Sequence, residues 1–377
     1  MNTQTKRVGW TTAMVATAVV TLAACGAGSE EVADTGETTS PGITAAKDFL
    51  AAHTDNPTSI GLDEPLSATP PTGKSVVYLR LPFPVAARAS DANAAAAKAL
   101  GWDYTAIDVG ATPATAVSAF EAAIAKKPDA IVYAGYPESF FTKQIKKAND
   151  AGIVVASNTT GDGPKSGVIA DLGLKDEELF GQLSAAYFVA NAGTKGKVAV
   201  FTLSAQPILT AFTNSFVAAV KEWCPSCTTE VVNQQVTDVG TKTPANVVSY
   251  LQRNPSVKWT AFANGDLAGG VGAAIKTAGI KDVTIFGEVP TEANLENVKA
   301  GTEGAWVGYP VDILGWRQMD VLARQFVGDD LAKAIETPLP GQVIDHDNAS
   351  AVAADDGGYY IAVDGYADQF KTLWKLN

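Results

Sequence analysis

The chain alternates short apolar runs with longer segments whose apolar residues recur at helical spacing, from about residue 75 to residue 328. Short apolar runs are typical of buried strands, and the helical spacing is typical of helices that pack on a sheet through one face. The pattern predicts strands at 75–81, 102–110, 129–135, 153–158, 197–203, 229–236, 259–265, 282–288 and 305–311.

Helical segments connect these runs, and one of them places Pro113 at its first position, where proline is favoured. Strands joined by helices form parallel, right-handed βαβ units. There are too many units for one small sheet, so the sequence predicts an α/β fold with two doubly wound parallel-sheet lobes. A ligand cleft is expected at the carboxyl ends of the strands. The predicted helices are 85–101, 113–127, 137–152, 176–193, 209–223, 244–254, 266–279, 291–301 and 313–328.

The first residues have the composition of an export signal. Two basic residues precede an apolar run at 11–24 that is short for a membrane-spanning helix. The sequence Leu-Ala-Ala-Cys at 22–25 resembles the bacterial lipobox, in which the signal is cleaved before a cysteine that then carries lipid. We expect a signal peptide at 1–24 and lipidation of Cys25. The alternative is a plain secretory signal with an incidental cysteine.

Two segments separate this signal from the α/β body. The polar, acidic composition of 25–42 predicts a disordered tether that begins at the lipidated cysteine. Residues 43–72 begin with a short helical pattern and continue with several prolines. We expect this second segment to form an arm on the domain surface.

Charge and length limit the possible partners. The chain has 377 residues and a formal net charge of −12. Nucleic acid is not an expected partner, because its phosphates must be neutralised by Lys and Arg. No apolar run beyond the N-terminal one is long enough to predict a membrane span.

Two further cysteines, Cys224 and Cys227, form a Cys-x-x-Cys motif at the end of a predicted helix. In an exported protein this spacing favours a small structural disulfide. A thioredoxin-like redox pair would open a helix after a strand, whereas this motif closes one. A zinc site would need more Cys or His ligands nearby, so no metal site is predicted.

The sequence offers little for catalysis. Its two histidines, His53 and His346, lie in the arm and the C-terminal tail, where a Ser-His or Cys-His system is not readily built. Asp266 and Glu288 each follow a predicted strand, and we interpret them as acceptors of hydrogen bonds from ligand hydroxyls rather than as acid–base groups. The sequence therefore predicts that the protein is not an enzyme.

No cofactor is expected either. The glycine-containing stretches 161–167 and 269–279 lack the order and spacing of phosphate-binding or dinucleotide-binding loops.

Taken together, the lipobox, the acidic tether and the two βαβ lobes resemble the type I periplasmic solute-binding proteins of ABC transporters. The likeness is closest to the ribose-binding-like group in its actinobacterial lipoprotein form. The segments that carry it are "TSIGLDEPL" with "PPTGKSVVYL", "KPDAIVYAGYP", "NDAGIVVASN", "WTAFANGDLAGGVGAAIKTAG", "TIFGEVPTEANLENVKAGTEGAW" and "ILGWRQMDVLAR".

The resemblance implies a chain that crosses between the lobes near Gly173, near Tyr309 and near Pro338, and lobes that close on a ligand by a hinge motion. It divides the body into a first lobe at 73–173 plus 309–337 and a second lobe at 174–308 plus 338–377.

The resemblance also implies a set of ligand-binding residues at the carboxyl ends of the strands. These candidates are Phe83, Arg88, Tyr136, Asn158, Thr159, Phe212, Asn214, Asp238, Asn264, Asp266, Glu288 and Tyr309.

The candidates depart from the family pattern in an informative way. Sugar binders often carry Asp-Arg where this chain has Asn158-Thr159, and an arginine near Phe212 or Asn214. These replacements favour a flatter or less polar ligand than ribose, although a sugar stacked on aromatic rings also fits. For Asp266 the alternative role is the N-cap of the following helix.

The function that the resemblance implies is a lipid-anchored, extracytoplasmic receptor on the outer face of the cell membrane. It would be a monomer that binds a sugar-like, aromatic or polyol small molecule and delivers it to an ABC permease. The alternative is a receptor of the same fold that signals through a membrane sensor.

Overall fold

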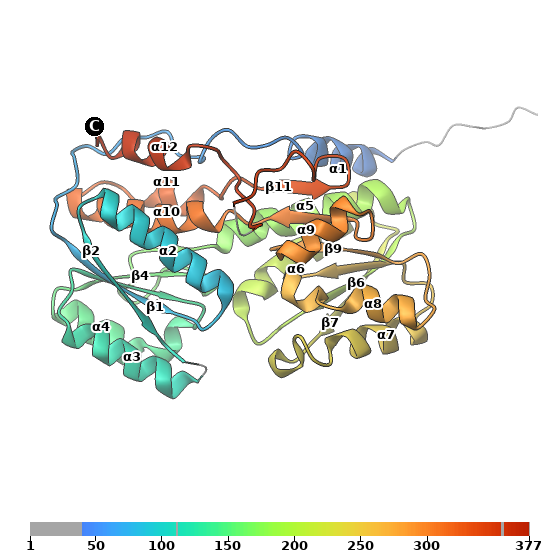
Figure 1. The fold of residues 1–377 in the computed structure, drawn as a ribbon, viewed down its shortest axis with the longest axis horizontal. Coiled ribbons are helices and arrows are strands. Elements are labelled where there is room, and N and C mark those ends of the chain that lie inside the picture. Colours follow the sequence, from blue (N-terminus) through green and yellow to red (C-terminus); the bar gives the residue numbers. More distant parts are fainter. Residues whose placement is uncertain (1–39, 111, 356–357, 377) are drawn as a thin grey trace, which may run out of the picture. The chain divides into compact units, whose positions relative to one another are not determined.

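The computed structural model describes residues 40–110, 112–355 and 358–376 (Figure 1). The predicted signal peptide 1–24, the predicted lipid attachment at Cys25 and most of the predicted tether lie outside the described residues. Within the described ranges, no helix combines the length and apolarity that a membrane span requires.

The first lobe is built on a five-stranded sheet in which every pairing is parallel, in the order β2-β1-β3-β4-β5. The strands are β1 (Ser75–Arg80), β2 (Asp103–Asp108), β3 (Ala130–Ala134), β4 (Val154–Asn158) and β5 (Asp171–Leu172). The helices that pack with it are α2 (Pro84–Ala99), α3 (Pro113–Ala125), α4 (Thr142–Asp150) and α10 (Val311–Val327).

Helices cover both faces of this sheet, as a parallel sheet requires. Figure 1 shows α3 and α4 side by side below the strands and α2 above them. Phe120 and Phe141 are fully buried between the sheet and the α3–α4 pair. On the other face α2 packs on α10, and a Cβ on Gly315 would lie only 2.6 Å from the Cβ of Ala92. A glycine there allows the two helices to approach closely.

The second lobe is built on a six-stranded sheet in the order β11-β10-β9-β8-β6-β7. The strands are β6 (Lys197–Thr202), β7 (Thr228–Asn233), β8 (Trp259–Phe262), β9 (Thr284–Glu288), β10 (Ala305–Gly308) and β11 (Gln342–Asp345). Its helices are α5 (Leu174–Ala192), α6 (Pro207–Trp223), α7 (Thr243–Arg253), α8 (Val271–Thr277) and α9 (Glu292–Lys299).

The described strands confirm the predicted pair of α/β lobes with mostly parallel sheets. The edge strand β11 was not predicted, and it pairs antiparallel with β10. It reaches the sheet after the short helix α11 (Ala332–Glu336) rather than through a full crossover helix, so a parallel arrangement is not required.

Two predicted helices are interrupted. The segment 137–152 divides into the 3₁₀ turn η1 (Glu138–Phe140) and α4, with buried Phe141 at the break. The segment 266–279 divides into the 3₁₀ turn η3 (Gly265–Ala268) and α8, because Gly270 adopts a left-handed conformation with φ of 76°.

The arm begins earlier than predicted. Helix α1 (Pro41–Ala51) starts two residues inside the predicted tether, with Ser40 as its N-cap and Pro41 at its first position. It packs on α5 and α6 of the second lobe. The contact is tight, because a Cβ on Gly42 would lie 2.2 Å from the carbonyl oxygen of Trp223.

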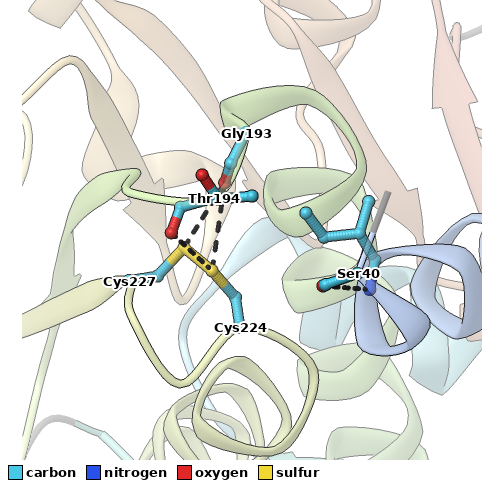
Figure 2. Close-up of a disulfide and its surroundings, with 6 residues drawn as sticks. Ser40, Gly193, Thr194, Cys224 and Cys227 are labelled. Atoms are coloured by element: carbon cyan, nitrogen blue, oxygen red, sulfur yellow. Dashed lines mark hydrogen bonds between the residues drawn. A yellow bond between two sulfur atoms is a disulfide. The ribbon is translucent and has the colours of Figure 1, made fainter. Parts of the chain in front are cut away.

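A disulfide joins Cys224 and Cys227 directly after α6 (Figure 2). Its sulfur atoms lie 3.6–3.9 Å from the carbonyl oxygens of Gly193 and Thr194, at the end of α5. Because a disulfide has no S–H, these are close contacts rather than donated bonds. The bridge therefore closes the turn after α6 and packs it against the end of α5.

The chain passes between the two sheets at three places. Gly173 stands between β5 of the first sheet and α5, which packs on the second sheet. Tyr309 follows β10 and leads into α10 of the first lobe, and Pro338 lies between α11 and β11.

The last helix differs from the predicted division. The sequence assigns 338–377 to the second lobe, but α12 (Tyr366–Leu373) packs on α10 of the first lobe. Trp374 stacks on Trp316 with 5.3 Å between ring centroids, and its Nε1 donates to Asp320 Oδ1 at 2.8 Å. Burial of these two indoles holds α12 against the first-lobe helix α10.

Candidate functional site

A cavity of about 360 Å³ lies where segments of both lobes meet. Its walls come from the start of α2, the loop after β8, the loop after β9, the crossing after β10 and residues 359–360 of the C-terminal tail. Except for the tail, these segments follow the carboxyl ends of strands, which is where open α/β sheets bind ligands.

Arg88 forms the charged part of the first-lobe wall. Its Nη1 donates to Asp355 and its Nη2 donates to Asp312 Oδ2 at 2.5 Å. The guanidinium carbon lies 4.6 Å from the ring centroid of Tyr359. Burial opposes the charge on Arg88, but the hydrogen bonds and charges of the two carboxylates raise its pKa overall. The side chain is therefore a fixed cation held by three neighbours.

Asp266 faces this wall from the second lobe. Asn264 positions it, because Asn264 Oδ1 accepts from the Asp266 backbone N–H at 2.8 Å and caps the turn η3. The predicted alternative of Asp266 as the helix N-cap is therefore wrong, since Asn264 takes the capping role and α8 begins later. The Asp266 carboxylate has no hydrogen bond or ion pair with any described residue, and desolvation raises its pKa.

A glycine between these two residues brings the second-lobe loops together. The Gly265 N–H donates to the Val289 carbonyl oxygen at 3.1 Å, and a Cβ on Gly265 would lie 2.5 Å from that oxygen. Any larger residue would push the loop after β8 away from the loop after β9. Gly265 therefore sets the width of this side of the cavity.

The C-terminal tail supplies two tyrosines that the sequence analysis missed. Tyr360 is buried with its ring against Gly308, where a Cβ would lie 2.5 Å from the ring, and its hydroxyl donates to Gln342 Oε1 at 2.8 Å. Tyr359 is partly exposed and covers Arg88. The feature of the sequence that could have identified them is the pair of adjacent tyrosines in a tail of mostly small and polar residues.

The structure brings some of the predicted ligand-binding residues together in this cavity. Those that line it are Arg88, Asn264, Asp266 and Tyr309. Tyr309 stands at the crossing itself, with its ring packed edge-on against Phe180.

Phe83 and Tyr136 lie on the first lobe outside these lining residues. Phe83 is the N-cap residue of α2 and is 43% exposed. Tyr136 is half-buried, contacts Phe140 and donates from its hydroxyl to the Gly110 carbonyl oxygen at 3.4 Å. Both follow first-lobe strands, so they border the same end of the sheet as Arg88.

Asn158 and Thr159 lie deeper, at the end of β4. Asn158 is buried, its Oδ1 accepts from the Thr159 hydroxyl at 2.9 Å, and its Nδ2 has no described partner. It also interacts with Tyr78, whose pKa burial raises to about 12. Neither residue lines the cavity.

Three predicted second-lobe contacts are not at the cavity. Phe212 is fully buried in the hydrophobic core with Phe216 and does not line the cavity. Asn214 is exposed two turns into α6. Asp238 belongs to the 3₁₀ turn η2 (Val236–Asp238), where its carbonyl oxygen accepts from the Thr243 hydroxyl at 3.0 Å.

Glu288 is at the end of β9, but its side chain is buried rather than open to the cavity. It meets the carboxyl group of Glu177, in the first turn of α5. Burial and this like-charged neighbour raise the pKa of Glu288 well above its ordinary value, and burial raises that of Glu177 to about 8. The two groups therefore form a buried carboxyl pair whose pKa values are both raised.

Among the described residues, no cluster of His, Cys, Asp and Glu has the arrangement of a metal site. The cavity groups can instead donate and accept hydrogen bonds and present aromatic faces. Such an arrangement can bind a small polar molecule.

Residues 83–330 match the family model described as a periplasmic binding protein domain. No curated protein matches the chain.

Solved structures share the fold. An ABC transporter solute-binding protein from Agrobacterium vitis with bound allitol is 22% identical, with a TM-score of 0.65 over 74% of this chain and 98% of that chain. A periplasmic ribose ABC transporter protein from Conexibacter woesei is 21% identical, with a TM-score of 0.66 over 75% and 95%. A chain of the XylFII-LytSN complex is 20% identical, with a TM-score of 0.61 over 74% and 99%.

Proposed function

Because the chain belongs to the periplasmic binding protein family, we propose that it is an extracytoplasmic receptor that captures a small sugar-like solute and delivers it to an ABC permease. The observation that carries the proposal is the cavity lined by both lobes at the carboxyl ends of their strands. Its volume of about 360 Å³ falls in the range of small-molecule sites.

The chemistry of the cavity suits a polyhydroxylated molecule. Asp266 offers carboxylate acceptors, Asn264 offers an amide, and Tyr309 and Tyr359 offer hydroxyls and ring faces. The solved relatives support this class, since one is described with bound allitol and another as a ribose transporter protein. The proposed ligand class includes aromatic molecules, because the three tyrosines that line the cavity can stack on an aromatic ring.

We further propose that Cys25 carries lipid and holds the receptor at the outer face of the cell membrane as a monomer. The proposal is supported by the lipobox-like sequence at 22–25. One acyl chain binds a membrane only marginally and more than one binds it stably, so anchoring requires multiple acylation.

A thermal-shift screen tests the ligand class. The full-length protein is mixed with ribose, other pentoses and hexoses, allitol and related polyols, and aromatic acids. Ligand at about 100 times its dissociation constant stabilises the folded state by about 2.7 kcal/mol, which raises the melting temperature measurably.

The screen includes a matched pair of variants. Asp266→Ala removes a cavity carboxylate, whereas Glu296→Gln changes an exposed carboxylate on α9 that pairs with Lys299. We expect the first variant to lose the ligand-induced shift and the second to keep it. The absence of any shift from every sugar and polyol would contradict the proposed solute class.

The second candidate function is ligand sensing through a membrane partner. The observation that favours it is the similarity to a chain of the XylFII-LytSN complex. Affinity purification of the intact protein from its own membranes, with and without ligand, separates the two: a permease subunit supports transport and a sensor protein supports signalling.

A further inference from the structure

The charges around the cavity bear on the kind of solute that it accepts. Within the described part of the chain, Arg88 is the one cationic side chain in the cavity lining. Both of its terminal nitrogens already donate to carboxylates, Asp355 and Asp312. The Arg88 Nε has no hydrogen-bond partner among the described residues, but an anion that reached it would also lie close to these two carboxylates, and like charges repel.

The anionic side chains of the cavity are not neutralised in the same way. Asp266 and Glu292 both line it, and neither has a hydrogen bond or ion pair from its side chain to any described residue. Glu292 opens α9 and lies against Gly358 of the tail, on the second-lobe side of the cavity. Two carboxylates therefore face the space that a ligand would fill.

The sum of these groups is negative. Arg88 is outnumbered by Asp312 and Asp355, and Asp266 and Glu292 add two more negative charges. A cleft lined by one sign of charge concentrates ligands of the opposite sign. A cation that reaches Asp266 gains a charge-assisted hydrogen bond, which is about twice as strong as a neutral one.

We propose that the solute carries an amine or ammonium group, which Asp266 binds with help from Glu292, and that acidic solutes are excluded. This inference rests on the proposed solute-binding function and specifies its ligand as a cationic member of the sugar-like class, such as an amino sugar. The charge of Arg88 is offset by Asp312 and Asp355, so Arg88 gives the cavity no net positive charge to attract an anion.

Matched sugars of different charge test the proposal. Titration calorimetry at low salt compares glucose with glucosamine and glucuronate, galactose with galactosamine and galacturonate, and ribose with its amino and acid analogues, using the full-length protein. We expect the amine of at least one series to bind about ten- to hundredfold more tightly than its neutral parent. The acid of that series should bind more weakly than the parent.

Variants of the cavity carboxylates show which side chain is responsible for the tighter binding of the amine. Asp266→Asn should remove most of the advantage of the amine over the neutral parent, and Glu292→Gln should reduce it by a smaller factor. Glu296→Gln, four residues along α9 from Glu292 and outside the cavity lining, should leave the advantage unchanged. If Asp266→Asn fails to fold, Glu292→Gln and the dependence of amine affinity on salt carry the same test.

The outcomes distinguish this inference from the function on which it rests. Binding of a neutral sugar with no gain from the amine, or tighter binding of the acid, overturns the cationic ligand and leaves the receptor function in place. Absence of binding by every member of all series overturns the sugar-like solute class and this inference with it.

Discussion

The buried carboxyl pair of Glu177 and Glu288 should make the stability of this protein depend strongly on pH. Glu288 is fully buried, both of its oxygens lack a described hydrogen-bond donor, and Asp176 adds a further carboxyl group nearby. Burial first, and then the charge of Glu177, raise the pKa of Glu288 well above its ordinary 4.5. In the pH range between these two pKa values, the folded protein holds a proton that the unfolded chain releases.

The magnitude follows from proton linkage. Where the folded state binds one more proton than the unfolded state, the free energy of unfolding falls by about 1.36 kcal/mol for each pH unit. The raised pKa of Glu288 therefore contributes stability that is fully present below pH 4.5 and declines as pH rises toward its folded-state pKa. Across the interval from the ordinary pKa to the folded-state pKa, the loss from this one group is about 1.4 kcal/mol for each pH unit.

Glu288→Gln removes this proton and keeps the size of the side chain. The glutamine can also donate from its amide nitrogen to the Glu177 carboxyl group. We expect the variant to gain stability relative to the native protein as pH rises, by about 1.4 kcal/mol per pH unit over the same interval. Urea unfolding followed by tryptophan fluorescence at several pH values measures the difference.

Glu296→Gln is the control, because Glu296 is exposed and its replacement should change stability by no more than about 0.5 kcal/mol at any pH. A stability difference between native protein and Glu288→Gln that stays constant from about pH 5 to about pH 7 would refute the reasoning. It would mean that Glu288 is ionised in the folded protein.

Three further predictions concern residues outside the cavity. Cys224 and Cys227 should resist thiol labelling under denaturing, non-reducing conditions in protein recovered from the cell surface, and complete labelling of both would contradict the bridge. Cys25→Ala should leave the protein uncleaved or released from the membrane fraction, and native protein without acyl groups in mass spectrometry would exclude the anchor. Phe212→Ala should lower the free energy of unfolding by about 3–5 kcal/mol without changing ligand affinity, and a selective loss of affinity would restore Phe212 to the binding site.

Much of the fold could be predicted because each element buries one face. In the βαβ units, the strands appear as apolar runs and the helices as apolar residues at helical spacing, so each element can be recognised from a short stretch of sequence. The edge strand β11 and helix α12 were missed because their partners are distant in the chain. β11 requires β10, and the burial of Trp374 requires Trp316 of α10.

The site was predictable only in part, for a related reason. The carboxyl end of a strand can be recognised in sequence, and Asp266 and Tyr309, which were predicted from such positions, both line the cavity. The direction of a side chain at that end cannot be recognised, and the side chain of Glu288 is buried against Glu177 instead of lining the cavity. Tyr359 and Tyr360 depend on the path of the tail across the cavity, which no local pattern records.

The packing of helix α1 on the second lobe determines which lobe moves when the N-terminus is held. Because α1 packs tightly on α5 and α6, a pull on the N-terminal end of the described chain acts on the second lobe. If the N-terminus is attached to a membrane, the second lobe stays fixed relative to the membrane when the lobes close. The first lobe, together with α12, then makes the larger movement. Distance changes measured from the membrane surface on ligand binding should then be larger for a probe on α3 than for a probe on α7.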